Sequence, residues 1–303
     1  MERRAVLIVG FGGPERPEEV RPFLEALLAG RGVPPARKEQ AASHYHAIGG
    51  GSPYNDHVRK QAAALKAALE REGMPLPVHI GMRNWHPYVD AALAALAREG
   101  AERIVAFVLA AHRCEASWGR YQAAVDEALT RLDGPRPDVV YPRPWHNHPL
   151  FIQALAARTA EAIARLPESD RQRAQLVLTA HSVPVAMDGA DSYVAELQET
   201  GRSLAKTLGF GSFALAFQSR SGNPREPWLE PDLTQIMTGL AGQAVVLVPI
   251  GFLCDHLEVL YDLDVQAAEF ARTLGIRMER APTVGDHPLF VAMMAAVVRA
   301  SLA

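Results

Sequence analysis

Apolar residues along the chain fall into short runs, separated by longer segments in which apolar and polar positions recur with helical spacing. A continuous apolar run of about four to eight residues is typical of a strand buried on both faces, so the short runs predict strands. The segments between them are rich in Ala, Leu, Arg and Glu, and those at 89–100 and 193–209 each end at a glycine, which predicts helices. The predicted strands cover residues 4–10, 77–81, 103–109, 175–180, 212–217 and 243–250. The alternation predicts an α/β protein with parallel sheets.

Short motifs recur along the chain. The segment NHPLF at 147–151 is repeated as DHPLF at 286–290, and each copy precedes an alanine-rich helical segment. Residues 106–115 align with 247–256 at nearly the same offset, and residues 8–14 likewise parallel residues 178–184. A chance similarity between apolar strands is the alternative, but three matches in one order make it the weaker interpretation.

The repeat predicts two similar halves, residues 1–143 and 144–303, each a parallel sheet flanked by helices. The alignment places Phe11 opposite His181 and brings Cys114 to within one position of Cys254. We expect the last helix, about residues 287–302, to pack back on the first half. In duplicated α/β proteins the ligand site usually lies between the halves, so we also expect an active-site cleft there.

Composition excludes several classes of protein. The 303 residues, 49% of them hydrophobic, suffice for two domains of about 150 residues each. A net charge of −3 with interspersed charged residues gives no basic stripe for nucleic acid. The chain has 2 cysteines and no CxxC pair, so a disulfide framework, a zinc knuckle and an iron-sulfur cluster lack support.

The same features bear on location. The apolar run at the amino terminus is followed by Gly-Gly-Pro-Glu instead of a longer core and a cleavage site, so no signal sequence is predicted. No later apolar run reaches about 18 residues, so no transmembrane segment is predicted. With reduced thiols, this predicts a cytoplasmic protein.

Candidate chemistry lies where two predicted strands end. His181 follows the strand at 175–180, and the segment 249–266 leaves a valine-rich strand for a helix. In that helix Glu258, Asp262 and Gln266 are four residues apart and are expected to share one face. Ligands bind beyond the carboxyl ends of parallel strands, so both groups are expected at one rim of the sheet.

Structural roles compete with catalytic ones here. A lone histidine after a strand is most often a structural residue that bonds a loop, and two carboxylates on a helix are as often a solvated face. Their shared position after buried strands of the same half favours function. Neutral imidazole with carboxylates suits a divalent ion such as Fe²⁺ that is held loosely, and it suits proton removal.

Six segments together resemble the ferrochelatases, which insert Fe²⁺ into a porphyrin in heme synthesis, and the resemblance covers essentially the whole chain. The segments are GFGGPERPEEVRPFL (10–24), HYHAIGGGSPYN (44–55), GMRNWHP (81–87), LTAHSVP (178–184), FQSRSGNPREPWLEP (217–231) and VPIGFLCDHLEVLYDLD (248–264). The resemblance implies two Rossmann-like chelatase domains and a lyase. Residues 10–55 look most similar to the branch that acts on coproporphyrin III, with protoporphyrin IX as the next candidate.

The resemblance also implies roles for individual residues. His181 corresponds to the metal-binding histidine that accepts protons, Glu258 to its partner carboxylate across the porphyrin plane, and Asp262 to a candidate position on an acidic path. We therefore expect a gap sized for a tetrapyrrole between His181 and Glu258. The residues that correspond to those around the macrocycle and its propionates are Phe11, Arg31, His44, Tyr45, Ser52 and Tyr121.

The chain departs from some relatives in ways that limit the comparison. Phe11 stands where some have tyrosine, so no phenolic ligand is available there, and Gln266 replaces an acidic residue of some relatives. The extra cysteines of the iron-sulfur branches are absent, so no iron-sulfur cluster and no tightly bound cofactor are expected.

Ferrous iron and a small-molecule porphyrin are the expected substrates, and transient contact with other enzymes of the heme pathway is expected. Two other functions are weighed: a cobalt or nickel chelatase of a related tetrapyrrole, and a heme or porphyrin carrier without turnover. Short cobalt chelatases often carry histidine where this chain has Phe11. A carrier needs no pair such as His181 and Glu258.

Overall fold

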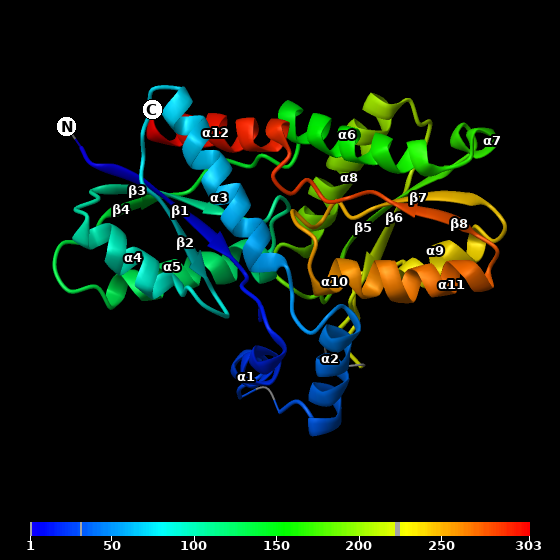
Figure 1. Ribbon diagram of the computed structural model, residues 1–303, viewed down its shortest axis with the longest axis horizontal. Helices are drawn as coiled ribbons and strands as arrows, with labels where there is room; N and C mark the ends of the chain where they lie inside the picture. Colours follow the sequence, from blue (N-terminus) through cyan, green and yellow to red (C-terminus); the bar gives the residue numbers. More distant parts are fainter. Residues whose placement is uncertain (1, 31, 222–224) are drawn as a thin grey trace. The chain divides into compact units, whose positions relative to one another are not determined.

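The computed structural model describes residues 2–30, 32–221 and 225–303, and two four-stranded parallel sheets are present in this part of the chain (Figure 1). The first sheet has the order β2-β1-β3-β4 and the second the order β6-β5-β7-β8. The shared order places β1 and β5 at equivalent positions, as a duplication predicts. The predicted fold class is therefore confirmed. The strands are β1 (Arg4–Gly10), β2 (Val78–Met82), β3 (Arg103–Val108), β4 (Asp138–Val140), β5 (Gln175–His181), β6 (Ala214–Gln218), β7 (Ala244–Val248) and β8 (Arg277–Arg280).

The six predicted strands all form, but sequence analysis missed β4 and β8. β4 consists of Asp-Val-Val, and β8 has the sequence Arg-Met-Glu-Arg, so neither contains an apolar run. Each pairs with a single neighbour at the edge of its sheet. Edge strands are partly exposed, and they need no continuous apolar sequence.

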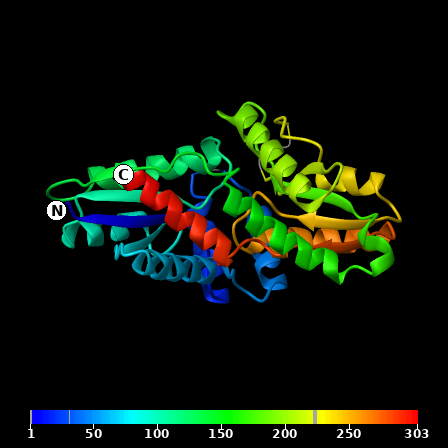
Figure 2. The same cartoon turned by 90° about the horizontal axis from the view of Figure 1, so that it is seen from above.

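Helices cover both faces of each sheet (Figure 2). The predicted helices at 89–100 and 193–209 correspond to α4 and α8, and α8 ends at Gly209, whose φ of 77° lies in the left-handed region. The helices are α1 (Pro17–Leu27), α2 (Pro35–Ala47), α3 (Tyr54–Arg71), α4 (Val89–Arg98), α5 (Arg120–Thr130), α6 (Pro149–Arg165), α7 (Glu168–Arg171), α8 (Ala190–Leu208), α9 (Leu233–Gly239), α10 (Leu257–Leu260), α11 (Ala268–Thr273) and α12 (Pro288–Leu302), with π-helical turns η1 (Glu115–Gly119) and η2 (Asp262–Ala267).

The repeated His-Pro motif starts two helices. His148 Nδ1 accepts a hydrogen bond from the Leu150 N–H at 3.2 Å at the start of α6, and His287 Nδ1 accepts one from the Leu289 N–H at 3.3 Å at the start of α12. An acceptor at this position satisfies one of the free N–H groups of the first turn. The histidines of the repeat therefore serve helix entry.

The contacts divide the chain into two compact units. Unit 1 contains residues 1–109, 119–143 and 291–303, and unit 2 contains residues 110–118 and 144–290. The segment 110–118 precedes the midpoint of the chain but groups with unit 2, and α12 begins in unit 2 and continues in unit 1. Within unit 1, Arg299 of α12 pairs with Glu72 at 2.6 Å.

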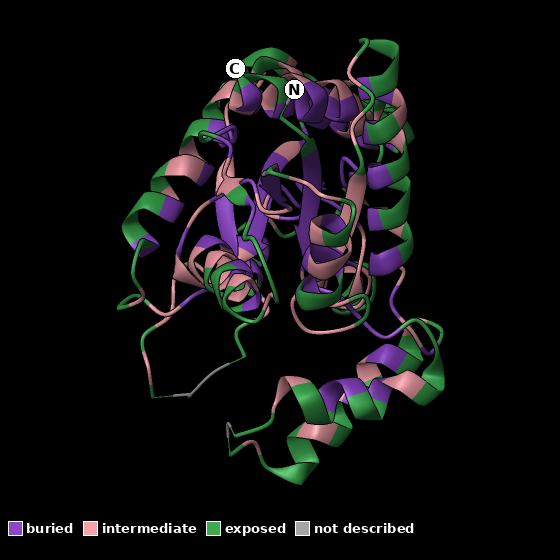
Figure 3. Cartoon of the chain, turned by 90° about the vertical axis from the view of Figure 1, so that its left-hand side faces the viewer, coloured by how far each residue is buried: buried purple, intermediate pink, exposed green. Residues whose placement is uncertain are grey.

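The cores lie between each sheet and its helices. The interior residues of the strands are buried, while the outward faces of the helices are exposed (Figure 3). In unit 2, for example, Val177 and Val245 of the sheet pack with Leu263 and Met237 from the helical layer. Among the described residues, no helix combines the length and apolar content needed to cross a membrane.

Candidate active site

His181 is the last residue of β5, an interior strand of the second sheet. Residues 176–180 of this strand are buried, whereas the His181 side chain keeps 29% of its surface exposed. The apolar run thus anchors the strand between β6 and β7 and delivers one polar side chain at the carboxyl end of the sheet. This is the rim at which parallel sheets bind ligands.

Both ring nitrogens of His181 face acceptors. Nδ1 is hydrogen-bonded to the backbone carbonyl of Ser182, and because a carbonyl only accepts, Nδ1 carries the hydrogen. Nε2 lies 3.5 Å from Oε1 of Glu258, which follows the neighbouring strand β7. The sequence correctly brought these two residues to one rim.

The expected gap between them is wrong. At 3.5 Å from Nε2 to Oε1, the imidazole and the carboxylate are in contact, and no tetrapyrrole fits between them. The physical reason is that the carboxylate of Glu258, on α10, attracts the oppositely charged imidazole at the end of β5. Both side chains belong to unit 2.

The pair is strongly polarised. Burial alone would lower the pKa of His181, but the Glu258 carboxylate, together with the hydrogen bonds of the ring, raises it to about 9. Burial likewise opposes ionisation of Glu258, yet His181 holds the pKa of this carboxyl well below its usual range. At neutral pH the pair is therefore an imidazolium-carboxylate ion pair.

A second histidine contacts the same carboxylate. His256 Nε2 lies 3.5 Å from Glu258 Oε2, and its Nδ1 bonds the carbonyl of Cys254 at 3.1 Å. Glu258 thus lies between two imidazoles. Sequence analysis did not select His256, although its position two residues before Glu258 was a usable signal.

Asp262 lies beside the pair but on a different kind of turn. α10 ends at Leu260, and the following turn η2 is π-helical, with the Gln266 N–H bonded to the Tyr261 carbonyl at 2.9 Å. The three residues Glu258, Asp262 and Gln266 therefore do not share one continuous α-helical face as expected, because the backbone hydrogen bonds change to the i→i+5 pattern at this turn. Gln266 is exposed, whereas Glu258 and Asp262 are partly buried.

Asp262 accepts a hydrogen bond from the hydroxyl of Ser219. Burial raises the pKa of Asp262 to about 6, against the opposing effect of this hydrogen bond and with the nearby charge of Glu258 adding to the rise. A carboxyl with this pKa exchanges protons readily near neutral pH. Asp262 can therefore relay a proton close to the His181–Glu258 pair.

The turn between β7 and Glu258 approaches β5 very closely. The Gly251 N–H donates to the Thr179 carbonyl at 3.1 Å, and a Cβ at Gly251 would lie 2.7 Å from the Cβ of Ala180, the residue before His181. Only glycine allows this approach without displacing β5 or the turn. Gly251 therefore helps to keep the two strand ends at contact distance.

Gly251→Ala is expected to lower the free energy of unfolding by about 1–3 kcal/mol, because the added methyl group overpacks the contact with Ala180. Urea denaturation followed by circular dichroism measures the change. Gly211→Ala is the matched control, since a Cβ at Gly211 meets no atom within 4 Å. Equal stability of the two variants would contradict the close contact.

In unit 1 the structure brings together two of the residues predicted to bind the macrocycle. Arg83, from the loop after β2, lies with its guanidinium carbon 5.7 Å from the centroid of the Phe11 ring and 5.4 Å from that of Tyr121. Both distances are typical of cation–π contacts. Sequence analysis noted the motif around Arg83 but did not select this residue. The motif GMRNWHP was the available signal.

Ser52 lies in the glycine loop that packs against the loop after β1. Its N–H donates to the Pro14 carbonyl at 2.7 Å, and its hydroxyl accepts from the Tyr54 N–H at 3.3 Å. A Cβ at Gly51 would lie 2.5 Å from the carbonyl oxygen of Glu15, so the glycine run is what allows the two loops to touch. The buried Asn55 side chain bonds both backbone groups of Gly13.

His44 and Tyr45 lie on α2. Tyr45 is buried, with its ring edge against Phe23 of α1 at a centroid distance of 6.2 Å. His44 is partly exposed, and burial lowers its pKa. The predicted site residue Arg31 lies outside the described residues.

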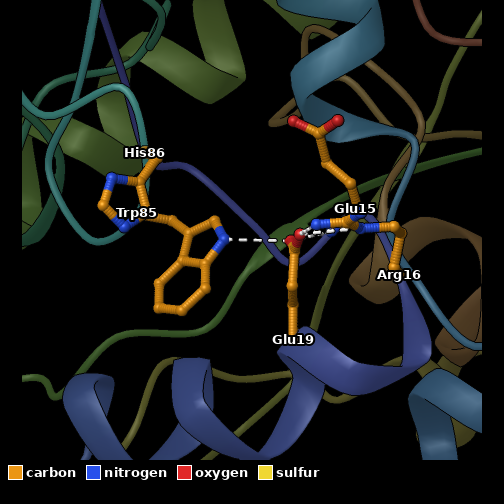
Figure 4. A pocket seen from close by; sticks show the side chains of 5 residues that line it. All are labelled: Glu15, Arg16, Glu19, Trp85 and His86. Carbon is orange, nitrogen blue, oxygen red and sulfur yellow. Dashed lines mark hydrogen bonds and ion pairs between the residues drawn. The ribbon is translucent and has the colours of Figure 1, made fainter.

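A pocket of about 490 Å³ lies beside the loop after β1, and Figure 4 shows its lining. Glu19 makes several of the hydrogen bonds in this pocket. Its carboxylate accepts them from the Glu15 N–H at 2.9 Å, the Trp85 indole at 3.2 Å and Arg16 at 2.7 Å. Although burial opposes ionisation, these donors lower the pKa of Glu19. The predicted site residues are not part of this lining, which instead fixes the loop that carries Phe11.

The sequence-predicted residues therefore fall into two groups. His181, Glu258 and Asp262 lie together in unit 2, and Phe11, His44, Tyr45, Ser52 and Tyr121 lie in unit 1. The cleft between the halves stays a prediction. Within the described part of the chain, no set of three or more His, Cys, Asp or Glu side chains converges as a metal site, and both cysteines are buried and free.

Comparison with known proteins gives consistent results. A family model described as Ferrochelatase matches residues 3–302. Coproporphyrin III ferrochelatase of Nocardia farcinica is 41% identical over 100% of this chain and 89% of its own length, and that of Mycolicibacterium smegmatis is 40% identical over 96% of this chain and 87% of its own length.

Solved structures with low sequence identity share the fold. The sirohydrochlorin chelatase SirB from Bacillus subtilis subspecies spizizenii, in complex with cobalt, has a TM-score of 0.63 and 13% identity, over 99% of this chain and 95% of that one. CbiX, described as the terminal enzyme of siroheme biosynthesis in denitrifying bacteria, has a TM-score of 0.57 and 15% identity, over 99% of this chain and 100% of that one.

Proposed function

The chain belongs to the ferrochelatase family, and we propose that it inserts ferrous iron into coproporphyrin III at the His181–Glu258 pair. Family membership makes it a porphyrin metal chelatase, a lyase of heme synthesis. The observation that carries the site is the 3.5 Å contact of His181 Nε2 with Glu258 Oε1 at the carboxyl end of β5. The choice of coproporphyrin III is supported by the relatives at about 40% identity over nearly the whole chain.

Iron insertion is an exchange of one Fe²⁺ for the two N–H protons of the porphyrin. Because Nδ1 of His181 donates to the Ser182 carbonyl, Nε2 is the nitrogen that can accept a proton or contact iron. In the resting pair Nε2 is protonated, since the pKa of His181 is raised to about 9. The pair must therefore release this proton before it can take one from a pyrrole.

Ferrous iron supplies the driving force for that release. A divalent cation near the pair disfavours the imidazolium by repulsion and is attracted by Glu258, so iron and the proton compete for the same two side chains. Asp262, with a pKa of about 6, is the next acceptor for the displaced proton. We propose that the protons leave toward Asp262 as iron enters.

The planar porphyrin hides its nitrogen lone pairs, so the ring must bend before iron can bind. A site complementary to the bent ring stabilises the transition state more than the flat ground state. We propose that the residues around Phe11, Arg83 and Tyr121 contribute this shape from unit 1. The imidazole and carboxylate of unit 2 then act on the exposed nitrogens.

The proposal is tested by an anaerobic assay of Fe²⁺ insertion, run side by side on coproporphyrin III and protoporphyrin IX. We expect both to be metalated, with the higher kcat/KM for coproporphyrin III. Insertion of cobalt or nickel in place of iron would identify a different chelatase. Tight porphyrin binding without metal-dependent loss of free-porphyrin fluorescence would identify a carrier and overturn the proposal.

A further inference from the structure

Gln218 is buried at the end of β6, directly beside the end of β5. Its backbone carbonyl accepts a hydrogen bond from the Ser182 N–H at 2.8 Å. The Ser182 N–H belongs to the peptide group that joins His181 to Ser182. The carbonyl of this peptide group, that of His181, accepts a hydrogen bond from the Tyr193 hydroxyl at 3.1 Å. Both polar groups of the peptide between His181 and Ser182 are therefore hydrogen-bonded, the N–H to Gln218 and the carbonyl to Tyr193.

The side chain of Gln218 reaches the other member of the pair. Its Nε2 donates to the backbone carbonyl of Glu258 at 2.7 Å and to the hydroxyl oxygen of Ser219 at 3.3 Å. The Glu258 carbonyl can only accept, so the amide nitrogen of Gln218 must face it. One residue therefore bonds the backbone next to His181 and the backbone of Glu258.

Glu258 needs such an external bond because its own helix is short. α10 comprises only 4 residues and gives way to the π-helical turn η2. A helix of one turn is not stable by its own hydrogen bonds and takes its position from tertiary contacts. The bond from Gln218 is a buried contact of this kind.

The next residue reinforces this arrangement. Ser219 has a φ of 62°, which is costly for a residue with a side chain and persists only where the surroundings hold it. Its hydroxyl donates to Asp262, so the dipeptide 218–219 bonds the Asp262 side chain, the backbone of Glu258 and the backbone N–H of Ser182, the residue that follows His181. Strain of this kind tends to collect at functional sites.

We propose that Gln218 is a positioning residue that sets the distance between the imidazole of His181 and the carboxylate of Glu258. This inference rests on the proposed function of that pair. Gln218 itself touches neither iron nor porphyrin in this scheme. Groups that orient metal-binding side chains typically change affinity or rate by about 10–100-fold when they are removed.

The test compares Gln218→Met, which keeps the length of the side chain but removes the donor, with Gln218→Glu, which keeps its shape and turns an acceptor toward the Glu258 carbonyl. Both are expected to lower kcat for iron insertion into coproporphyrin III by roughly 10–100-fold. KM for the porphyrin is expected to stay within about twofold, because Gln218 is not among the residues expected around the macrocycle. Circular dichroism checks that each variant folds. If Gln218→Met does not fold, the result for Gln218→Glu decides the test.

Thr159→Val is the matched control. Thr159 is fully buried in α6 of the same unit and donates to the Leu155 carbonyl at 2.7 Å, so its loss removes one buried hydrogen bond away from the pair. Its kcat is expected to equal that of the parent protein. Parent-like kcat in both Gln218 variants, or an equal loss in Thr159→Val, overturns the positioning role.

Binding of Zn²⁺ reports on the geometry of the His181–Glu258 pair without any catalytic turnover. It therefore tests this inference separately from the proposed function. Isothermal titration calorimetry measures the affinity of the protein for Zn²⁺, and the part of this affinity that is lost in Glu258→Gln is assigned to the pair. Gln218→Met is expected to weaken this Zn²⁺ binding by about tenfold or more. A parent protein that binds Zn²⁺ in this way but inserts no iron refutes the proposed function alone. An unchanged Zn²⁺ affinity in Gln218→Met, together with active parent protein, refutes the inference alone.

Discussion

Replacing His181 with alanine is expected to lower the rate of iron insertion by about 10²–10⁴-fold, the range that a positioned proton acceptor contributes. The imidazole is the one group at the end of β5 whose Nε2 can take a pyrrole proton, since its Nδ1 is engaged with Ser182. Binding of the porphyrin is expected to change little, because most of the residues that resemble the family's macrocycle contacts lie in unit 1. Loss of free-porphyrin fluorescence under anaerobic conditions measures insertion, and quenching without metal measures binding.

A second histidine–glutamate pair in the chain provides the control for this experiment. His79 of β2 lies with its Nε2 3.1 Å from Oε1 of Glu99, in unit 1. His79→Ala removes another imidazole that lies beside a glutamate and should leave the insertion rate unchanged. Equal rates for His181→Ala and the parent protein would end the case for His181 as the proton acceptor.

Replacing Glu258 with glutamine is expected to lower the pKa of His181 from about 9 to a value near or below its ordinary 6.5. The sign follows from the causes: burial lowers this pKa, and the charge and hydrogen bond of Glu258 are the main effects that raise it. Titration of the histidine ring signals by NMR measures the change. The acid limb of kcat/KM is expected to move to lower pH with it, because kcat/KM reports the groups of the free enzyme.

In the same variant the rate of iron insertion is expected to fall by about two orders of magnitude. The Glu258 carboxylate is both the partner of the imidazole and the anion that attracts iron, and the substitution removes it. Glu99→Gln, which alters the His79 pair, should change neither the rate nor the pKa of His181. A His181 pKa that stays near 9 in Glu258→Gln would show that the contact does not exist in solution.

The pair also makes stability depend on pH. The pKa of His181 is about 9 in the folded protein and 6.5 in an ordinary setting, so its contribution to the free energy of unfolding is complete below about pH 6.5 and disappears as the pH rises through about 9. In Glu258→Gln this part of the pH dependence should vanish. Urea denaturation at pH 6 and pH 9 serves as an additional reading of the same variant.

The fold could be predicted from the sequence wherever burial of an element produces a recognisable pattern of apolar residues. Interior strands such as β1 and β5 read as apolar runs because both of their faces are covered, and the repeat located Phe11 and His181 at equivalent strand ends. β4 and β8 were missed because these two edge strands are short and carry polar residues, whereas the edge strands β2 and β6 are apolar enough to be predicted. The pattern therefore predicts the middle of each sheet better than its edges.

The candidate site was predicted in its members but not in its geometry. His181 and Glu258 could be assigned to one rim because both follow buried strands, yet their distance depends on the close approach of Gly251 to Ala180, which no periodicity encodes. The π-helical turn around Asp262 likewise has no signature in residue spacing. Gln218 lies in the quoted segment 217–231 but was not selected, because a neutral amide in a strand matches no catalytic motif.

Residues 110–118 and 291–303 determine where this chain can be divided. Each of these segments belongs to the unit built mainly from the opposite half, so the chain leaves and re-enters each unit. A cut at the midpoint of the chain would therefore separate each unit from one of its own segments. Residues 1–143 expressed alone would lack the segment 291–303 of unit 1, and residues 144–303 expressed alone would lack the segment 110–118 of unit 2.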